Sequence, residues 1–147
     1  MKAVPIALAV VLLSFGIVAG VVLGLGDDEV LTQPPEAVAQ EFVRAMSLGQ
    51  TGAAREMLSH DAERRTSAVE VRRISDRFRA RLGRLEEVEG TVAHRRRDTA
   101  TVRIRIEGEQ ATADRHMALV RESGAWSVAR ASDILASEDS RPEPSRP

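Results

Sequence analysis

The hydrophobic residues of this chain follow three different patterns in turn. Residues 3–26 are almost wholly apolar and include no charged side chain. Between residues 36 and 82 the apolar positions recur with the spacing of an amphipathic helix, and between residues 86 and 130 they alternate with polar positions, as in a half-buried strand. The pattern therefore predicts a membrane-length segment, then helices, then an antiparallel sheet.

Three helices are predicted in the middle of the chain. Two consecutive prolines suit the first turn of a helix, and the apolar stripe that follows extends over residues 36–47. A short helix is predicted over residues 51–58 and a longer one over residues 67–82, with a glycine after it as a stop signal. The polar residues 59–66 are predicted to form a connection between these two helices.

Four strands are predicted after the helices, at residues 86–94, 99–107, 110–121 and 126–130. The second strand has the clearest pattern, because apolar residues occupy every other position and threonine, arginine or glutamate occupies the rest. A meander of this kind buries one face under the helices and leaves the other in water. The predicted fold class is therefore α+β, with the helices preceding the sheet.

The apolar segment 3–26 is long enough to cross a membrane. As a helix its 24 residues would span about 36 Å, against a hydrocarbon core of about 30 Å. Lys2 precedes the segment, and Asp27, Asp28 and Glu29 follow it. Because positive residues favour the cytoplasmic side, we expect a single-pass protein with a cytoplasmic N-terminus and an extracytoplasmic C-terminal domain.

Glycine recurs at every fourth position of this segment, at Gly16, Gly20 and Gly24. On a helix these glycines share one face, and small residues at this spacing allow two membrane helices to approach closely. The spacing favours packing of the span against a second copy or a protein partner. A cleaved secretory signal remains an alternative, with Gly24 and Gly26 before the cleavage point.

The chain is accordingly divided into four regions. Residues 1–26 form the predicted transmembrane anchor and residues 27–33 an acidic linker. Residues 34–135 form the predicted α+β domain, and residues 136–147 a polar, proline-rich tail that is expected to be disordered.

Composition narrows the function classes. The chain has 21 Lys+Arg and 22 Asp+Glu, a formal net charge of −1, and neither cysteine nor tyrosine. The charge balance argues against a nucleic-acid partner, and the absence of cysteine excludes disulfides and thiolate metal sites. Arginines nevertheless concentrate in residues 64–97. One interpretation is that they bind an anionic lipid surface or an acidic partner, and the other is that they form a solvated helix face.

Two stretches resemble a known family. The opening helices read PEAVAQEFVRAMSLGQTGAAREMLS, and residues 119–126 read LVRESGAW. Together they resemble NTF2-like (cystatin-like) domains, and the second resembles the LV-x-E-x-G-x-W turn of small extracytoplasmic members of the DUF4878 type. A membrane span before such a domain is also similar to the Mce-associated membrane proteins. The resemblance covers residues 34–135 and implies a cone in which a curled sheet wraps a long helix and can leave a pocket.

The residues expected to line such a pocket are Phe42, Met46, Phe78, Met117 and Trp126. Related folds that act as isomerases or dehydratases place Asp, His or Tyr in the pocket, as the resemblance implies. This chain lacks tyrosine, so a phenolic oxyanion donor is excluded.

The polar candidates for chemistry are His94, Asp114 and His116. Asp114 and His116 lie two positions apart on a predicted strand and so share a face, where a histidine–carboxylate pair can act as base and orienting group. The same spacing also fits the solvated face of the strand. Zinc-binding, phosphate-binding and nucleophile-elbow motifs are absent from the sequence, so neither a metal nor a cofactor is expected.

The sequence thus favours a membrane-anchored, extracytoplasmic domain that binds a partner or a ligand and is not an enzyme. A protein partner or a homodimer is expected. The resemblance implies an accessory subunit of an envelope or transport complex. Two alternatives stay open at this point: a small-molecule isomerase or hydrolase-like enzyme on the same fold, and a cleaved, secreted binding protein.

Overall fold

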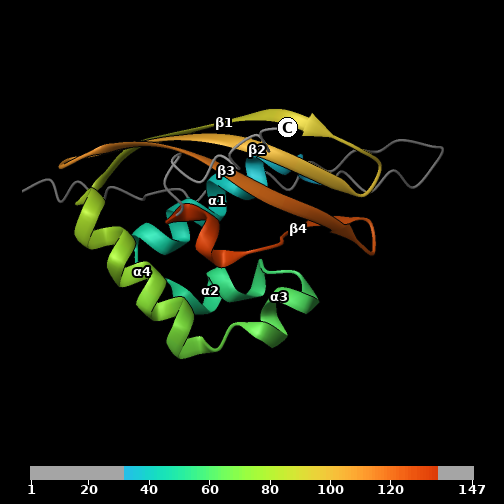
Figure 1. The fold of residues 1–147 in the computed structure, drawn as a ribbon, viewed down its shortest axis with the longest axis horizontal. Coiled ribbons are helices and arrows are strands. Elements are labelled where there is room, and N and C mark those ends of the chain that lie inside the picture. The colour runs from blue at the N-terminus through green and yellow to red at the C-terminus, as the bar shows by residue number, and fades with distance from the viewer. Residues whose placement is uncertain (1–31, 136–147) are drawn as a thin grey trace, which may run out of the picture.

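A computed structural model describes residues 32–135, which form four α-helices, a four-stranded sheet and a short 3-10 helix (Figure 1). The elements are α1 (Pro35–Ser47), α2 (Thr51–Glu56), α3 (His60–Arg65), α4 (Ala68–Leu82), β1 (Leu85–Arg95), β2 (Thr99–Gly108), β3 (Thr112–Glu122), β4 (Ala125–Val128) and η1 (Ala131–Ile134). The predicted order of helices followed by strands is confirmed.

Several predictions concern residues outside the described part of the chain. They are the anchor over residues 1–26 with its glycines Gly16, Gly20 and Gly24, most of the linker, and the tail over residues 136–147. Of the helices within residues 32–135, none combines the length and the apolar character needed to cross a bilayer.

Helix α4 begins and ends where the sequence predicts. The Ser67 hydroxyl accepts a hydrogen bond of 3.2 Å from the backbone N–H of Glu70, which caps the first turn. Gly83 follows the last turn with a φ of +72°, a conformation that glycine adopts without strain. Between these ends, one stripe of apolar residues is buried against the rest of the domain.

The predicted connection over residues 59–66 is wrong, because most of it forms helix α3. The Ser59 hydroxyl accepts a hydrogen bond of 3.2 Å from the N–H of Ala62, and acidic residues in the first turn and arginines in the last suit the helix dipole. Arg65 also pairs with Asp61 at 2.9 Å, one helical turn away. Only Ala62 of this helix is buried, so its sequence carries no hydrophobic stripe.

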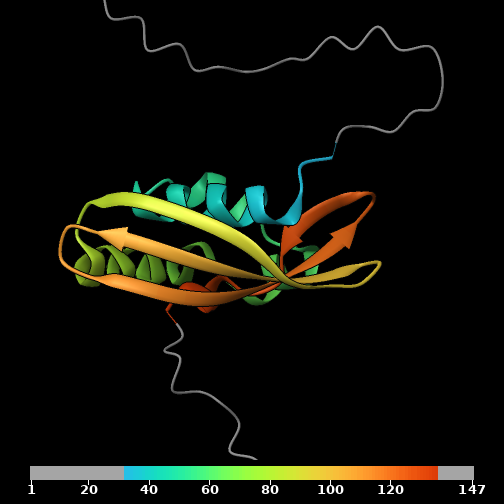
Figure 2. The same ribbon diagram turned by 90° about the horizontal axis from the view of Figure 1, so that it is seen from above.

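The sheet is an antiparallel meander in the order β1-β2-β3-β4, as predicted. The register places Val102 opposite Met117 and Ile104 opposite Arg115. The helices lie on one face of this sheet (Figure 1), and the view from above shows that the strands are long, twisted and curled (Figure 2). The other face carries exposed polar side chains such as those of Arg103 and Arg105.

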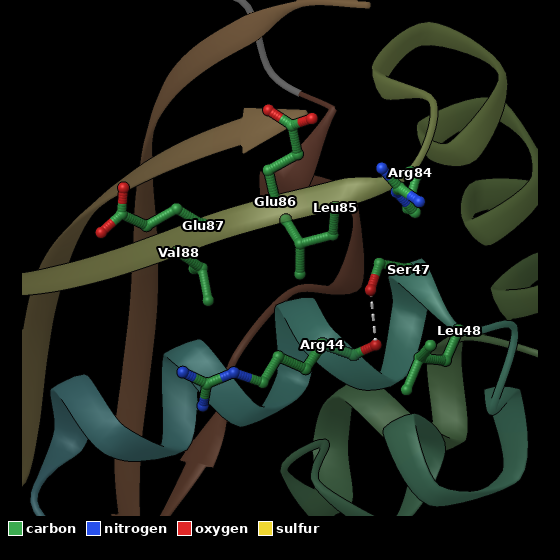
Figure 3. Close-up of a pocket in the computed structure, with 8 residues that line it drawn as sticks. All are labelled: Arg44, Ser47, Leu48, Arg84, Leu85, Glu86, Glu87 and Val88. Carbon is green, nitrogen blue, oxygen red and sulfur yellow. Dashed lines mark hydrogen bonds between the residues drawn. The ribbon is translucent and has the colours of Figure 1, made fainter. Parts of the chain in front are cut away.

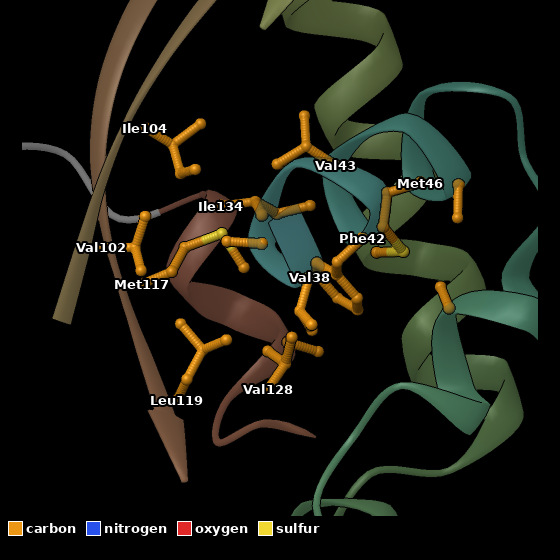
Figure 4. Packing of buried hydrophobic residues seen from close by; sticks show 14 of the residues in the cluster. Val38, Phe42, Val43, Met46, Val102, Ile104, Met117, Leu119, Val128 and Ile134 are labelled. Carbon is orange, nitrogen blue, oxygen red and sulfur yellow. The ribbon is translucent and has the colours of Figure 1, made fainter. Parts of the chain in front are cut away.

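The core fills the space between the sheet and α1 (Figure 4). Helix α1 lies close to β1, because a Cβ atom at Gly90 would be 3.1 Å from the carbonyl oxygen of Glu36 and 3.1 Å from Cδ1 of Ile104. A glycine on the inner face of β1 therefore allows the first turn of the helix to approach the sheet.

The C-terminal segment closes an edge that β4 leaves uncovered. β4 ends at Val128, but β3 extends further, and there the N–H of Ala118 donates to the carboxylate of Asp133 at 3.0 Å. The Nε–H of Arg115 donates to the carbonyl oxygen of Ile134 at 3.1 Å. η1 thus pairs a backbone N–H of β3 that a longer β4 would otherwise pair, and it also binds a side chain of β3.

Candidate functional site

The five side chains expected to line a pocket lie in the core of the cone. Phe42, Met46 and Met117 are 0% exposed, Phe78 is 4% exposed and Trp126 is 6% exposed. The close-up of this region shows side chains from α1 and from the inner face of the sheet directed toward one another (Figure 4). Solvent has no access to the first three. Of the five, only Phe78 lines a cavity that is described below for residues 32–135.

Trp126 is covered by an arginine from another strand. The guanidinium carbon of Arg95 lies 5.5 Å from the centre of the indole ring, within the range of a cation–π contact. The register shift between Val92 and His94 turns the end of β1, so that Arg95 pairs with the inward-facing Ala100. The bulge thereby directs an arginine toward the inner face of the sheet.

Asp114 and His116 lie on the outer face of β3, away from the helices. Asp114 pairs with Arg105 across the strand register and His116 pairs with Arg103, and both arginines are exposed. Oδ1 of Asp114 is 3.5 Å from Nη2 of Arg103, and the His116 side chain is exposed. These groups therefore form part of a charged, solvated ladder.

His94 lies on β1, in register with Thr101. Its Nε2 atom accepts a hydrogen bond of 3.3 Å from the Nε–H of Arg96, and its side chain is exposed. Within the described part of the chain, no group of three or more His, Cys, Asp or Glu side chains could hold a metal ion.

The largest described cavity is a cleft of about 510 Å³ between the end of α1 and the start of β1 (Figure 3). The residues that line it are Arg44, Ser47, Leu48, Arg84, Leu85, Glu86, Glu87 and Val88. Leu48 is 67% exposed, although most large apolar side chains of the domain are buried. The cleft thus combines apolar side chains with two arginines and two glutamates.

A smaller cavity of about 180 Å³ lies between the end of α4 and η1. Its walls are largely apolar and include Phe78, Leu82 and Ile134, with Arg81 and Arg115 beside them. The Arg115 guanidinium already donates hydrogen bonds to the carbonyl oxygens of Ile134 and Asp114.

No protein-family model matches the sequence, and no curated protein matches it either. The fold, however, is found among solved structures. The crystal structure described as that of a "putative NTF2-like transpeptidase" from Campylobacter jejuni is similar to this one, with a TM-score of 0.56. The similarity covers 66% of this chain and 98% of the other, at 15% sequence identity. The fold is NTF2-like. At 15% identity the similarity concerns the fold alone. What the NTF2-like domain shares with the Campylobacter jejuni structure is therefore its fold, with a curled sheet over the helices.

One contact of the NTF2-like domain was not foreseen from the sequence. Oε2 of Glu122 accepts a hydrogen bond of 3.1 Å from the backbone N–H of His60 and lies 3.1 Å from Nδ1 of the same residue. The contact joins the start of α3 to the end of β3, across 62 residues of sequence. No periodicity or motif marks such a pair, because the two residues meet only when the domain is folded.

Proposed function

We propose that this chain is a single-pass membrane protein whose extracytoplasmic NTF2-like domain binds a protein partner without catalysing a reaction. The observation that carries the proposal is a contrast within the domain. The interior of the cone is occupied by side chains such as Phe42, Met46 and Met117, whereas the largest described cleft opens on the outside and contains an exposed leucine.

Leu48 is the centre of the proposed binding surface. Its side chain is 67% exposed at the end of α1, beside Leu85 and the charged residues Arg44 and Glu86. An apolar centre with a rim of both charge signs is the usual arrangement at a protein interface. A polypeptide partner would bury Leu48 and pair with the rim.

The placement of the polar candidates supports a binding role over an enzymatic one. Asp114 faces Arg103, and His116 is exposed on the same outer surface, outside the cone. A base that acts on a small molecule normally lies in a concave site that excludes water. Neither residue borders the cleft at Leu48, the cavity beside Phe78, or a third cavity of about 230 Å³ between α3 and residues 129–132.

The anchor is proposed from residues 3–26, which are uncharged and long enough to span a bilayer. Lys2 before the segment and the acidic residues after it favour an extracytoplasmic domain. The resemblance to DUF4878-type and Mce-associated membrane proteins further suggests an accessory subunit of an envelope or transport complex. The face formed by Gly16, Gly20 and Gly24 would then pack against a partner helix or a second copy.

The anchor is tested on the full chain expressed in cells. Membranes are washed with alkaline carbonate, and the mass of the mature chain is measured. We expect the protein to stay with the membranes at its full mass. Release of the chain, or a mass that corresponds to cleavage after Gly26, would overturn the anchor and favour the secreted alternative.

The binding surface is tested by placing a photo-crosslinking amino acid at Leu48 of the full chain in native membranes. The matched control is Val69 on α4, which is 69% exposed but borders none of the described cavities. We expect a discrete protein adduct from position 48 and none from position 69. Adducts of equal yield from both positions, or from neither, would contradict a binding surface at the cleft.

A further inference from the structure

The end of the domain from which the chain leads back to residues 3–26 also carries two strand turns. Figure 2 shows the start of α1, in blue, on the same side as the β1–β2 turn and the β3–β4 turn. The packing agrees, because Glu36 in the first turn of α1 lies over Gly90, whereas Ser47 at its end lies near Leu85. α1 and β1 therefore run in opposite directions, and the β1–β2 turn lies beyond Glu36, toward the linker.

Four arginines gather on these two turns. They are Arg95, Arg96, Arg97 and Arg121, and all four side chains are exposed. The backbone N–H of Arg121 donates to the carbonyl oxygen of Asp98 at 2.8 Å, which joins the end of β3 to the β1–β2 turn. The four residues thus form one surface, which we call the turn arginines.

The turn arginines lack carboxylate partners within residues 32–135. Arg95 stacks over Trp126, the Nε–H of Arg96 donates to His94, and the Nε–H of Arg121 donates to the carbonyl oxygen of Gly124. The nearby carboxylate of Glu122 is instead engaged with His60. Asp98, in the β1–β2 turn, is a further exposed carboxylate, and no ion pair joins it to these arginines. Four arginines against the carboxylates of Asp98 and Glu122 leave this surface with an excess of positive charge.

Linker length limits how far this surface can lie from the membrane. Residues 27–33 are seven residues, which extend to about 24 Å at most. Helix α4, which carries other exposed arginines, instead ends at Leu82 against the β2–β3 turn, at the opposite end of the sheet from the β1–β2 turn (Figure 1). Of the two arginine-rich surfaces, the turn arginines are thus the one placed beside the tether.

We infer that the turn arginines bind the anionic phospholipid headgroups of the bilayer that holds residues 3–26. This inference rests on the anchor proposed above. One arginine near an anionic membrane surface increases the ratio of surface-bound to unbound protein roughly fivefold. Several arginines together therefore bias the orientation of a tethered domain. The domain would then lie with both turns against the headgroups and the cleft at Leu48 directed away from them.

The test uses the full chain, because it contains no cysteine and accepts a single introduced label. A fluorophore is attached to Ala125→Cys, an exposed position at the start of β4 beside the turns, or to Ala80→Cys, an exposed position on α4. The protein is reconstituted in vesicles of phosphatidylcholine, or of an equimolar mixture with phosphatidylglycerol, each with a headgroup-attached quencher. Vesicle flotation measures anchoring in the same samples.

We expect strong quenching at position 125 in the anionic vesicles, weak quenching there in the neutral vesicles, and weak quenching at position 80 in both. The double variant Arg96→Glu, Arg97→Glu should reduce the population in contact with lipid at least tenfold. These two arginines are chosen because neither packs on Trp126. The matched control is Arg72→Glu, Arg73→Glu on α4, which changes the charge equally and should leave the quenching unchanged.

Two kinds of failure are distinguishable. In the first, the chain floats with both vesicles, but the quenching does not depend on lipid charge. The anchor is then retained and the lipid contact is refuted. This result is expected if the linker carboxylates of Asp27, Asp28 and Glu29 pair with the arginines instead. Equal effects of the two double variants would also overturn the lipid contact, because the response would then follow net charge alone. A chain that floats with neither vesicle refutes the anchor, and the inference falls with it.

Discussion

The environment of Trp126 depends on one side chain from a different part of the sheet. Its own strand, β4, is only four residues long, the indole is 6% exposed, and Arg95 stacks over it at 5.5 Å. Trp126 is the only tryptophan of the chain, so tryptophan fluorescence reports on the surroundings of this one indole.

Arg95→Ala should therefore shift the tryptophan emission to longer wavelength. Loss of a cation–π contact at an exposed position should also lower the free energy of unfolding by about 0.5–1 kcal/mol. Emission spectra and urea denaturation measure the two effects. Arg97→Ala serves as the control, because Arg97 is exposed and does not stack on the indole. An unchanged spectrum in Arg95→Ala would show that the arginine does not cover the ring.

Asp133 is a buried carboxylate whose role is structural. Burial raises its pKa above the ordinary value of 3.8, while the hydrogen bond from the Ala118 N–H and the charge of Arg130 oppose that rise. A raised pKa means that the folded state binds the proton more tightly than the unfolded state. The stability linked to this group is therefore complete below pH 3.8 and is lost as the pH rises through the pKa of the folded state.

Asp133→Asn should remove this pH dependence. The asparagine oxygen can still accept from Ala118, so the variant should gain stability relative to the wild type as the pH rises from 3.8 toward neutrality, and should match it in acid. Asp133→Ala should instead lose about 1–3 kcal/mol, because the Ala118 N–H is left unpaired. Thermal denaturation across pH measures both, with Asp76→Asn as a control for the loss of one exposed charge. A pH profile of Asp133→Asn parallel to that of the wild type would contradict the linkage.

At the level of elements, the end of α4 is held by the β2–β3 turn. The N–H of Gln110 donates to the carbonyl oxygen of Leu82 at 3.0 Å, and the N–H of Glu109 donates to that of Arg84 at 2.9 Å. A Cβ atom at Gly108 would overlap Cγ and the carbonyl oxygen of Leu82. The turn therefore approaches the helix more closely than any side chain at position 108 permits.

Gly108→Ala should lower the free energy of unfolding by about 1–3 kcal/mol, because the backbone of Leu82 cannot move aside as a flexible side chain would. The matched substitution is Gly52→Ala in α2, where a Cβ atom would meet nothing within 4 Å. That variant should be neutral or gain up to about 1 kcal/mol, since alanine favours helices. Urea denaturation of the two variants provides the comparison, and equal destabilisation would refute the close approach.

The sequence predicted those elements whose own residues carry a periodic signal. α1 and α4 each bury an apolar stripe, and β2 alternates regularly, so their extents were close to those observed. α3 buries only Ala62, and its helical state depends on capping by Ser59, so hydrophobic spacing could not reveal it. The last strand was predicted over residues 126–130, but β4 ends at Val128. Beyond it, Asp133 of η1 pairs with the Ala118 N–H of β3, a contact between residues distant in sequence that hydrophobic spacing also could not reveal.

For the whole molecule, the sequence could predict which residues are apolar but not whether they leave a space between them. An NTF2-like cone with these residues could have held a pocket, and Met117 and Met46 were expected to line it. In the structure both are 0% exposed, with Phe42 equally buried beside them. Whether a cavity remains depends on how side chains from α1, β2 and β3 fit together, which no single segment encodes.

A filled cone predicts how the molecule responds when one large side chain is removed. Met117→Ala should lower the free energy of unfolding by about 2–5 kcal/mol and open an apolar cavity that binds xenon or benzene. The native protein should bind neither, as measured by methyl NMR shifts on titration with the probe. Met117→Val removes less volume, so it should keep the domain folded and give a smaller response even if the alanine variant unfolds.

Val69→Ala, at a position that is 69% exposed, should change stability by less than about 0.5 kcal/mol. Saturable probe binding to the native protein, with shifts at the Met117 methyl group, would mean that the cone contains an accessible pocket. The function to test would then be binding of a small molecule and not of a protein partner.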